Sequence, residues 1–289
     1  MNTLEASRIP TQGATRCALA RGRVPFARAA LASCTLCAHA CGVNRLRGPA
    51  GLCHAGGHAR IFSAQVEVSD ELELVPTFAL AFSGCDLRCD FCITGAPSWN
   101  PRLGELFDAA RLSSRIQRAL EEGARSVMFL GGEPTVHLPD VLELVAELPG
   151  SAKLVWKTNA HGSAQSREWL ENVFDVWLAD YKFGNDTCAE RLAHVRNYNS
   201  VVRENLLWAA SHSDLIIRHL LMPGHLDCCW RSVAEWIACH LPSIRVNLRS
   251  GFWPAWKAAR HAELRGTVGR VEAERASDIA RELNLRLIE

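Results

Sequence analysis

The sequence of 289 residues lacks three features that would assign it to common classes of protein. Its net charge is only +1, so no excess of either sign would attract nucleic acid or an anionic membrane surface. No run of 18 apolar residues occurs, which argues against a membrane span. No apolar stretch before a small-residue cleavage site marks a signal peptide. We therefore expect a cytoplasmic protein with neither nucleic acid nor a membrane as partner.

Residues 1–33 are also poor in acids, with Glu5 as the only one among five arginines. This composition resembles a transit peptide, but Pro10, Gly13, Gly22 and Pro25 interrupt it. The segment is interpreted as a poorly ordered N-terminal extension.

Cysteine, in contrast, is plentiful, with twelve in the chain. Seven of them form two tight clusters in the first third of the sequence, which in a reducing compartment favours metal binding over disulfides. The remaining five are expected to be small buried hydrophobic residues; they are Cys17, Cys188, Cys228, Cys229 and Cys239.

From residue 76 onward, short apolar runs alternate with longer amphipathic stretches, a pattern that predicts βαβ units and a mostly parallel sheet. The predicted strands are 76–83, 126–131, 153–159, 175–180, 215–221 and 244–249. The predicted helices are 108–122, 139–148, 164–172, 186–196, 200–211, 228–240 and 270–283. About six units are two fewer than a full eight-fold barrel. An α/β fold results, either a partial (β/α)6 TIM-type barrel over 76–289 or a doubly wound open sheet.

Residues 34–75 form a different kind of segment, rich in cysteine and glycine. Its second half, "ARIFSAQVEVSDELEL", has the pattern of a β-hairpin. We therefore expect a small Cys-rich N-terminal module that precedes the barrel.

The stretch "SGCDLRCDFCITG" follows the first predicted strand and places Cys85, Cys89 and Cys92 in a C-x3-C-x2-C spacing. In a parallel barrel this position is the C-terminal mouth, where active sites lie. Thiolates favour zinc or iron–sulfur clusters, and zinc motifs usually pair two C-x2-C halves. Three cysteines on one loop suit a [4Fe–4S] cluster whose fourth iron is open to another ligand, although zinc or a purely electron-carrying cluster remains an alternative.

This motif, with an aromatic residue, Phe91, before its last cysteine, resembles that of the radical S-adenosylmethionine (SAM) enzymes. The resemblance implies that the open iron binds SAM and that an electron from the cluster cleaves SAM to methionine and a 5′-deoxyadenosyl radical. It also implies a reductant partner such as flavodoxin or ferredoxin.

The ends of the later strands carry residues that match further elements of this family. After the second strand, Gly131, Gly132, Glu133 and Pro134 resemble the GGEP element that holds the methionyl ammonium group, although such a motif could also be a simple turn. The resemblance also assigns cofactor contacts to polar residues at the ends of the next two strands: Lys157, Thr158, Asn159, Asp180 and Lys182. Arg218, an arginine within an apolar strand, is a candidate for the SAM carboxylate or for a substrate acid.

Each of these residues also has a structural interpretation. Asn159 could cap a turn, and Asp180 with Lys182 could form a plain ion pair. Arg218, in an otherwise apolar strand, needs a partner or a ligand. His219 is expected to point to the opposite face with a structural role, and His225 is expected to be a solvated loop residue.

The sequence resembles most of all the pyruvate formate-lyase activating enzyme-like branch, through elements that run from about residue 34 to residue 225. Ile93 and Thr94 depart from that branch, where many members have Gln-Asn, and "VNLRSGFWP" replaces a tyrosine-containing segment. These departures concern the substrate side, so the sequence does not identify the substrate.

The second cysteine group has the spacing C-x2-C-x3-C-x11-C, formed by Cys34, Cys37, Cys41 and Cys53. Four thiolates at such spacing predict zinc or an auxiliary [4Fe–4S] cluster, the alternative being an ordered loop without metal.

Four functions are consistent with these motifs. The first is hydrogen abstraction from a small molecule or peptide in a biosynthetic pathway, and the second is installation of a glycyl radical on a partner protein. The third is a radical SAM methyltransferase, in which Cys188, Cys228 or Cys229 would carry the methyl group. The fourth is a non-catalytic iron–sulfur or zinc scaffold, which would not bind SAM.

Overall fold

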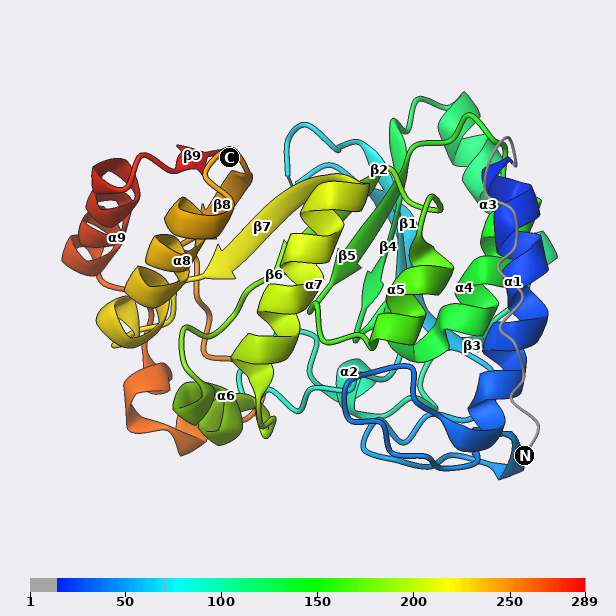
Figure 1. Ribbon diagram of the computed structural model, residues 1–289, viewed down its shortest axis with the longest axis horizontal. Helices are drawn as coiled ribbons and strands as arrows, with labels where there is room; N and C mark the ends of the chain where they lie inside the picture. The colour runs from blue at the N-terminus through cyan, green and yellow to red at the C-terminus, as the bar shows by residue number, and fades with distance from the viewer. Residues whose placement is uncertain (1–14, 70, 289) are drawn as a thin grey trace.

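The computed structural model of the protein describes residues 15–69 and 71–288 and contains a nine-stranded sheet in the order β3-β1-β2-β4-β5-β6-β7-β8-β9 (Figure 1). All six predicted strands are present, and each pairs in parallel with the next. They are β2 (Thr77–Phe82), β4 (Ser126–Gly131), β5 (Leu154–Thr158), β6 (Val176–Asp180), β7 (Asp214–Leu220) and β8 (Arg245–Arg249). The β-rich apolar runs therefore became strands of one sheet.

The predicted helices are confirmed as well, with ends shifted by a few residues. They are α3 (Ala109–Glu121), α4 (Leu138–Glu147), α5 (Ala164–Leu170), α6 (Asp186–Ala193), α7 (Tyr198–His212), α8 (Ser232–His240) and α9 (Arg270–Glu282). Shorter elements are α2 (Ala96–Trp99), η1 (Leu31–Ser33), η2 (Arg45–Arg47), η3 (Pro134–His137), η5 (Ala258–Arg260), η6 (Ala262–Arg265) and the π-helical turn η4 (Leu226–Arg231).

The two faces of the sheet are covered differently, which identifies the fold as a partial barrel. One face carries a small apolar cluster that includes Met128, Val155 and Ile216 and is closed by Leu74 from a loop. The other face packs against the helices in the main core. The sheet stays open, because β3 (Glu105–Leu106) and β9 (Arg286–Leu287) lie at its two edges. The doubly wound alternative, with helices on both faces, does not apply.

The prediction of a hairpin within residues 59–74 is wrong. A single strand, β1 (Arg60–Glu67), forms there and pairs antiparallel with β2, with Ala64 opposite Leu80. Residues 71–74 do not return beside β1, because Leu74 and Glu71 are buried beneath the sheet. The Cys-rich segment is therefore continuous with the barrel through β1.

The prediction that residues 1–33 are poorly ordered is wrong for residues 16–33, whereas residues 1–14 lie outside the described part of the chain. Helix α1 (Arg16–Ala30) begins at Thr15, whose side chain accepts from the backbone N–H of Ala18 at 3.3 Å. It includes Pro25, which interrupted the pattern in the sequence. The helix forms because it has a tertiary partner: Ala20 and Ala27 are fully buried, and α1 packs along α4 (Figure 1).

The arginines of α1 are the second reason for its order. Arg23 donates to the carbonyls of Trp169 and Glu171 at 3.1 and 2.6 Å. Arg28 contacts the carboxylates of Asp140 and Glu143 at 2.9 and 2.6 Å. Charges that suggested a solvated segment in the sequence therefore bind α1 to the barrel.

Within residues 15–69 and 71–288, none of the helices is both long and apolar enough to cross a bilayer.

The ion pair between Arg28 and the buried Asp140 gives a first prediction about stability. Burial raises the pKa of Asp140, and Arg28 opposes this rise. The substitution Arg28→Ala should therefore lower the free energy of unfolding by about 2 kcal/mol, because it leaves a buried carboxylate with one partner fewer. Urea denaturation followed by circular dichroism measures this change. The control Arg21→Ala removes an exposed arginine of the same helix and should cost about 0.5 kcal/mol or less; equal losses in the two variants would contradict the prediction.

Candidate functional site

The loop that follows β2 carries the three-cysteine motif at the C-terminal end of the sheet. Cys85 and Cys89 are buried and Cys92 is half-buried. The loop is held from the far side of the barrel mouth, because the backbone N–H groups of Arg88 and Asp90 donate to carbonyls at the end of α6, Ala193 and Leu192, at 3.1 and 2.9 Å. Backbone bonds therefore fix the loop that carries the thiols.

The donor set of this loop fits a cationic metal cluster. Burial raises the pKa of Cys89 to about 12, and nearby Lys182 opposes the rise. Burial, Asp86 and the neighbouring thiol of Cys89 also raise the pKa of Cys85. Grouped buried thiols of this kind ionise when a metal supplies the compensating charge. The three thiols are therefore suited to a metal cluster, and the assignment of Cys85, Cys89 and Cys92 as ligands of a [4Fe–4S] cluster stays a prediction.

Gly131 and Gly132 allow the end of β4 to approach the cysteine loop. A Cβ atom at Gly131, whose φ is +127°, would overlap the backbone of Phe82, and one at Gly132 would overlap the carbonyl of Gly84. Because glycine has no Cβ atom, the backbones can approach closely. The N–H of Gly132 donates to Phe82 O at 2.8 Å, and the N–H of Glu133 donates to Gly84 O at 2.9 Å. The two glycines therefore allow close approach to the loop that precedes Cys85.

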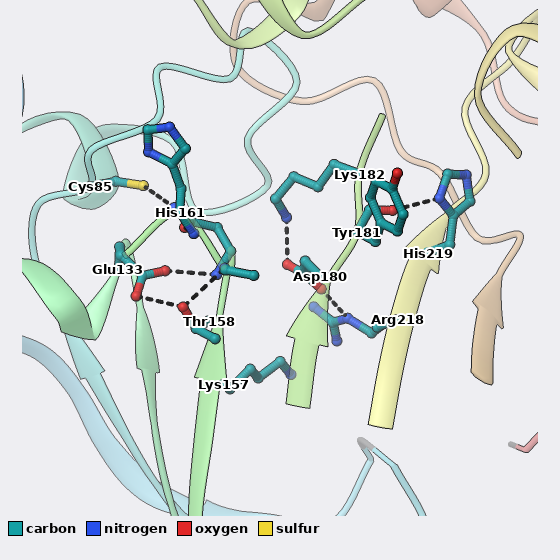
Figure 2. Close-up of polar contacts among 12 residues, drawn as sticks. Cys85, Glu133, Lys157, Thr158, His161, Asp180, Tyr181, Lys182, Arg218 and His219 are labelled. Carbon is teal, nitrogen blue, oxygen red and sulfur yellow. Dashed lines mark hydrogen bonds and ion pairs between the residues drawn. The ribbon is translucent and has the colours of Figure 1, made fainter. Parts of the chain in front are cut away.

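The Glu133 carboxylate joins the end of β4 to the end of β5 (Figure 2). One oxygen accepts from the Thr158 hydroxyl at 2.9 Å and from the N–H and hydroxyl of Thr135. The other accepts from the N–H of Asn159 at 2.7 Å. Burial and Asp86 raise the pKa of Glu133 to about 7. Its contact with the ammonium group of SAM stays a prediction, and Pro134 begins the 3-10 helix η3 beside it.

Asp86 is a buried residue of the site that the sequence did not single out. Its carboxylate accepts from the Asn159 side chain at 2.7 Å and lies 2.8 Å from Nδ1 of His161. Burial alone would raise the pKa of Asp86, but the bond to His161 and its charge lower it. The Asn159 amide also lies 3.8 Å from the sulfur of Cys85. Asp86 directly follows Cys85, a predicted metal ligand, and this adjacency is the signal that the sequence offered for it.

A network of charged side chains, half-buried except for the fully buried Glu71, lies within the barrel (Figure 2). Asp180 binds Lys182 on one side and Arg218 on the other, the latter at 2.8 Å. Burial would raise the pKa of Asp180, but the charges of Arg218 and Lys182 lower it. Glu71, from the loop beneath the sheet, lies 3.5 Å from Arg218 and 4.0 Å from Lys157. Four predicted residues are thus brought together, and Glu71, which the sequence analysis missed, joins them.

Phe91, on the cysteine loop, is buried against two other aromatic rings. Its ring lies 6.0 Å from that of Phe183 and 6.3 Å from that of Phe252. Its role beside the cofactor stays a prediction.

The four cysteines of the N-terminal group converge on one small cavity, which Cys34, Cys37, Cys41 and Cys53 line together. The buried Arg45 organises this loop: its guanidinium donates to Val136 O at 2.7 Å and to Gly56 O at 2.8 Å, and lies 3.6 Å from the sulfur of Cys34. Burial raises the pKa of both Cys37 and Cys53. A metal bound by these four thiols stays a prediction.

The two cysteine groups lie close together at the barrel mouth. His39, between Cys37 and Cys41, contacts the carbonyl of Asp86 at 3.0 Å, and its ring lies 4.9 Å from that of His161. The N–H of Ala38 donates to the carbonyl of His161 at 2.9 Å. The N-terminal loop is therefore seated on the end of β5.

Several minor predictions can also be compared with the structure. His219 is fully buried and contacts Tyr181 O at 2.7 Å, as expected of a structural residue. The expectation of a solvated His225 is wrong, because the ring is buried and lies 2.9 Å from Pro223 O. Of the five remaining cysteines, Cys228 and Cys239 are exposed rather than buried.

Comparison with known proteins agrees with the cysteine motif. The family model described as the radical SAM superfamily matches residues 80–237, more than half of the chain. An uncharacterised protein of Methanocaldococcus jannaschii is 31% identical over 278 residues, which cover 92% of this chain and 79% of that protein. The 7-carboxy-7-deazaguanine synthase of Methanothermobacter thermautotrophicus is 34% identical over 102 residues, 35% of this chain and 39% of that protein.

Solved structures show the same fold. Streptococcus suis SuiB bound to S-adenosylmethionine has a TM-score of 0.55 at 17% identity, over 70% of this chain and 47% of SuiB. SuiB bound to its precursor peptide SuiA gives a TM-score of 0.54 at 19% identity, over 70% of this chain and 46% of SuiB. This chain thus spans less than half the length of SuiB.

The segment that matches the family begins in β2, includes the loop with Cys85, Cys89 and Cys92, and ends in α8. On that match, and on a barrel whose first βα loop carries three grouped thiols, this chain belongs to the radical SAM superfamily.

Proposed function

We propose that this protein cleaves S-adenosylmethionine reductively and abstracts a hydrogen atom from a biosynthetic substrate. The observation that supports this most directly is the group of three thiols on the loop after β2, within the segment that matches the family. When bound there, a [4Fe–4S] cluster supplies the electron that divides SAM into methionine and a 5′-deoxyadenosyl radical. A flavodoxin or ferredoxin would supply the cluster with that electron.

The charged residues of the barrel are suited to a zwitterionic cofactor. Lys182 lies close enough to Cys89 to lower the pKa of that thiol, so its ammonium group is the nearest candidate for the carboxylate of SAM. Asp180, held between Lys182 and Arg218, is the candidate for the ribose hydroxyls. Asn159 and Glu133 bound the same space from the ends of β5 and β4. These assignments agree with those that the family resemblance implies.

The substrate side is proposed to lie at Ile93, where the chain departs from the activating enzyme-like branch. Ile93 is 80% exposed, and Trp253 is 66% exposed. The ring of Trp256 lies so close to Gly95 that a Cβ there would approach it to 3.1 Å. Apolar side chains thus adjoin the cysteine loop on its outer side. Their exposure favours a second candidate function, the activation of a partner protein by a glycyl radical, since a protein surface would cover them.

The N-terminal cysteines are proposed to hold an auxiliary metal centre, a second [4Fe–4S] cluster or a zinc ion. The convergence of all four on one cavity supports this assignment. Because His39 and Asp86 connect the two cysteine loops, the auxiliary centre would brace the loop that holds the first cluster.

The substitution Cys89→Ala should abolish formation of 5′-deoxyadenosine in the dithionite-reduced, anaerobically reconstituted protein, because the cluster loses one of its three anchors. Chromatographic analysis of the products measures the effect. The control Cys239→Ala removes an exposed thiol of α8 and should leave product formation unchanged. Formation at the wild-type rate by Cys89→Ala would refute the proposed role of the loop.

The substitution Cys37→Ala should lower the metal content of the protein but retain measurable cleavage of SAM that is uncoupled from substrate, because the first cluster keeps its own ligands. Elemental analysis for iron and zinc, alongside the same product assay, measures both effects. Unchanged metal content would contradict the auxiliary centre, and complete loss of cleavage would contradict its auxiliary role.

The substrate itself can be identified by deuterium transfer. The reduced protein is incubated with SAM and, in turn, deuterated candidate metabolites or a candidate glycine-containing partner. Mass spectrometry should detect deuterium in 5′-deoxyadenosine for the true substrate only, because that product carries the abstracted atom. Formation of 5′-deoxyadenosine without transfer from either class would count against both candidate functions.

A further inference from the structure

A third group of sulfur ligands lies apart from the two cysteine clusters. Cys188 is on α6, which follows β6, whereas Cys228 and Cys229 are on the π-helical turn η4, which follows β7. His225 immediately precedes η4. The ligand atoms of Cys188, His225 and Cys228 all lie within 4.8 Å of one another. Residues some 40 positions apart in the sequence are therefore gathered at one point of the barrel mouth.

The separations between the sulfur atoms match those of a metal site. The sulfurs of Cys188 and Cys228 are 3.9 Å apart, and those of Cys228 and Cys229 are 3.8 Å apart. In a tetrahedral zinc site with Zn–S bonds of about 2.3 Å, two sulfurs lie about 3.8 Å from each other. The same distances are far longer than the bond of about 2.05 Å in a disulfide.

The neighbours of His225 define a tautomer that is suited to metal binding. Its Nδ1 lies 2.9 Å from the carbonyl of Pro223, which can only accept, so Nδ1 carries the proton. Its Nε2 lies 3.2 Å from the guanidinium of Arg191, which can only donate, so Nε2 is the unprotonated nitrogen, and a bound ion would take the place of Arg191 at its lone pair. A ring nitrogen that donates to a backbone carbonyl while the other faces the ion is the usual arrangement of a metal-bound histidine.

Asn185 holds the two segments of the group together. Its side-chain amide donates to the sulfur of Cys188 at 3.3 Å and to the carbonyl of Cys228 at 2.7 Å. Arg191 brings a positive charge to the same point and is itself paired with Glu263.

We propose that Cys188, His225 and Cys228 bind a thiophilic divalent cation of the zinc class, with Cys229 as the nearest donor for a fourth position. Binding releases the protons of the two thiols to solvent, and no electron is transferred. Two thiolates neutralise the charge of the ion, and the neutral imidazole completes the three ligands. The site connects the segment after β6 to the segment after β7. The first of these segments carries Lys182, and β7 itself carries Arg218. It is independent of the proposed function.

Zinc analysis of the full-length protein tests this site. Protein isolated anaerobically from zinc-supplemented cells is dialysed against a weak chelator, and its metals are measured by mass spectrometry. The double variant C188S/C228S should contain about one zinc per chain less than the wild type, with unchanged iron. The control Cys239→Ser removes an exposed thiol of α8 and should keep the full zinc content. Equal zinc in the double variant and the wild type would overturn the proposal.

A second variant separates loss of a ligand from loss of the fold. His225→Gln keeps all thiols and should weaken zinc binding at least tenfold in competition with a chromophoric chelator. Added Zn2+ should raise the thermal midpoint of chelator-treated wild type but not of the double variant, since an ion that binds only the folded chain stabilises it. A Cys188–Cys228 disulfide in peptide maps, with no zinc retained, would also overturn the proposal. None of these measurements depends on SAM cleavage, so the outcome is separate from that of the proposed function.

Discussion

The arrangement of the cysteine loop depends on one close contact between backbones, in which the end of β4 touches the end of β2. A side chain at Gly132 would occupy the space of the Gly84 carbonyl, so the contact exists only with glycine at that position. The contact places the N–H of Glu133 on Gly84, directly before Cys85. From there the Glu133 side chain reaches Thr158 and Asn159 at the end of β5. Three strand ends are thus fixed relative to the first thiol through two glycines and one carboxylate.

Beside this contact the barrel contains charges that are stable only as a group. A half-buried carboxylate such as Asp180 would be destabilising alone, and it stays ionised because Lys182 and Arg218 flank it and lower its pKa. Glu71, from the loop beneath the sheet, adds a negative charge on the far side of Arg218, so that positive and negative groups alternate. A cofactor that carries both an ammonium and a carboxylate group can join such a network with little change in total charge. These charged side chains inside the barrel explain why the inner face of the strands is only partly apolar.

Sequence reasoning succeeded where a pattern has one physical solution. β6, for example, is apolar on both faces and bounded by polar residues, so it could be predicted as a buried strand. It failed for α1, because Pro25 suggests a helix break while the partner that stabilises the helix, α4, is distant in the sequence. It also missed Glu71, which is unremarkable within "SDELELV" and becomes part of the charge network only through the turn beneath the sheet. The contacts of Asp86 with His161 likewise join positions 75 residues apart, which no local spacing reveals.

Different kinds of side chain connect the loops in the two halves of the barrel mouth. The loops after β2, β4 and β5 are joined by buried carboxylates, Asp86 and Glu133, next to the thiols of the first site. A carboxylate accepts several hydrogen bonds at once, so it can hold loops rigidly while leaving sulfur free for iron. On the other half, Asn185 and the sulfurs of Cys188 and Cys228 join the segment after β6 to that after β7. There β6 and β7 are already paired through their backbones, and these side chains add a second connection, between the loops that follow the two strands.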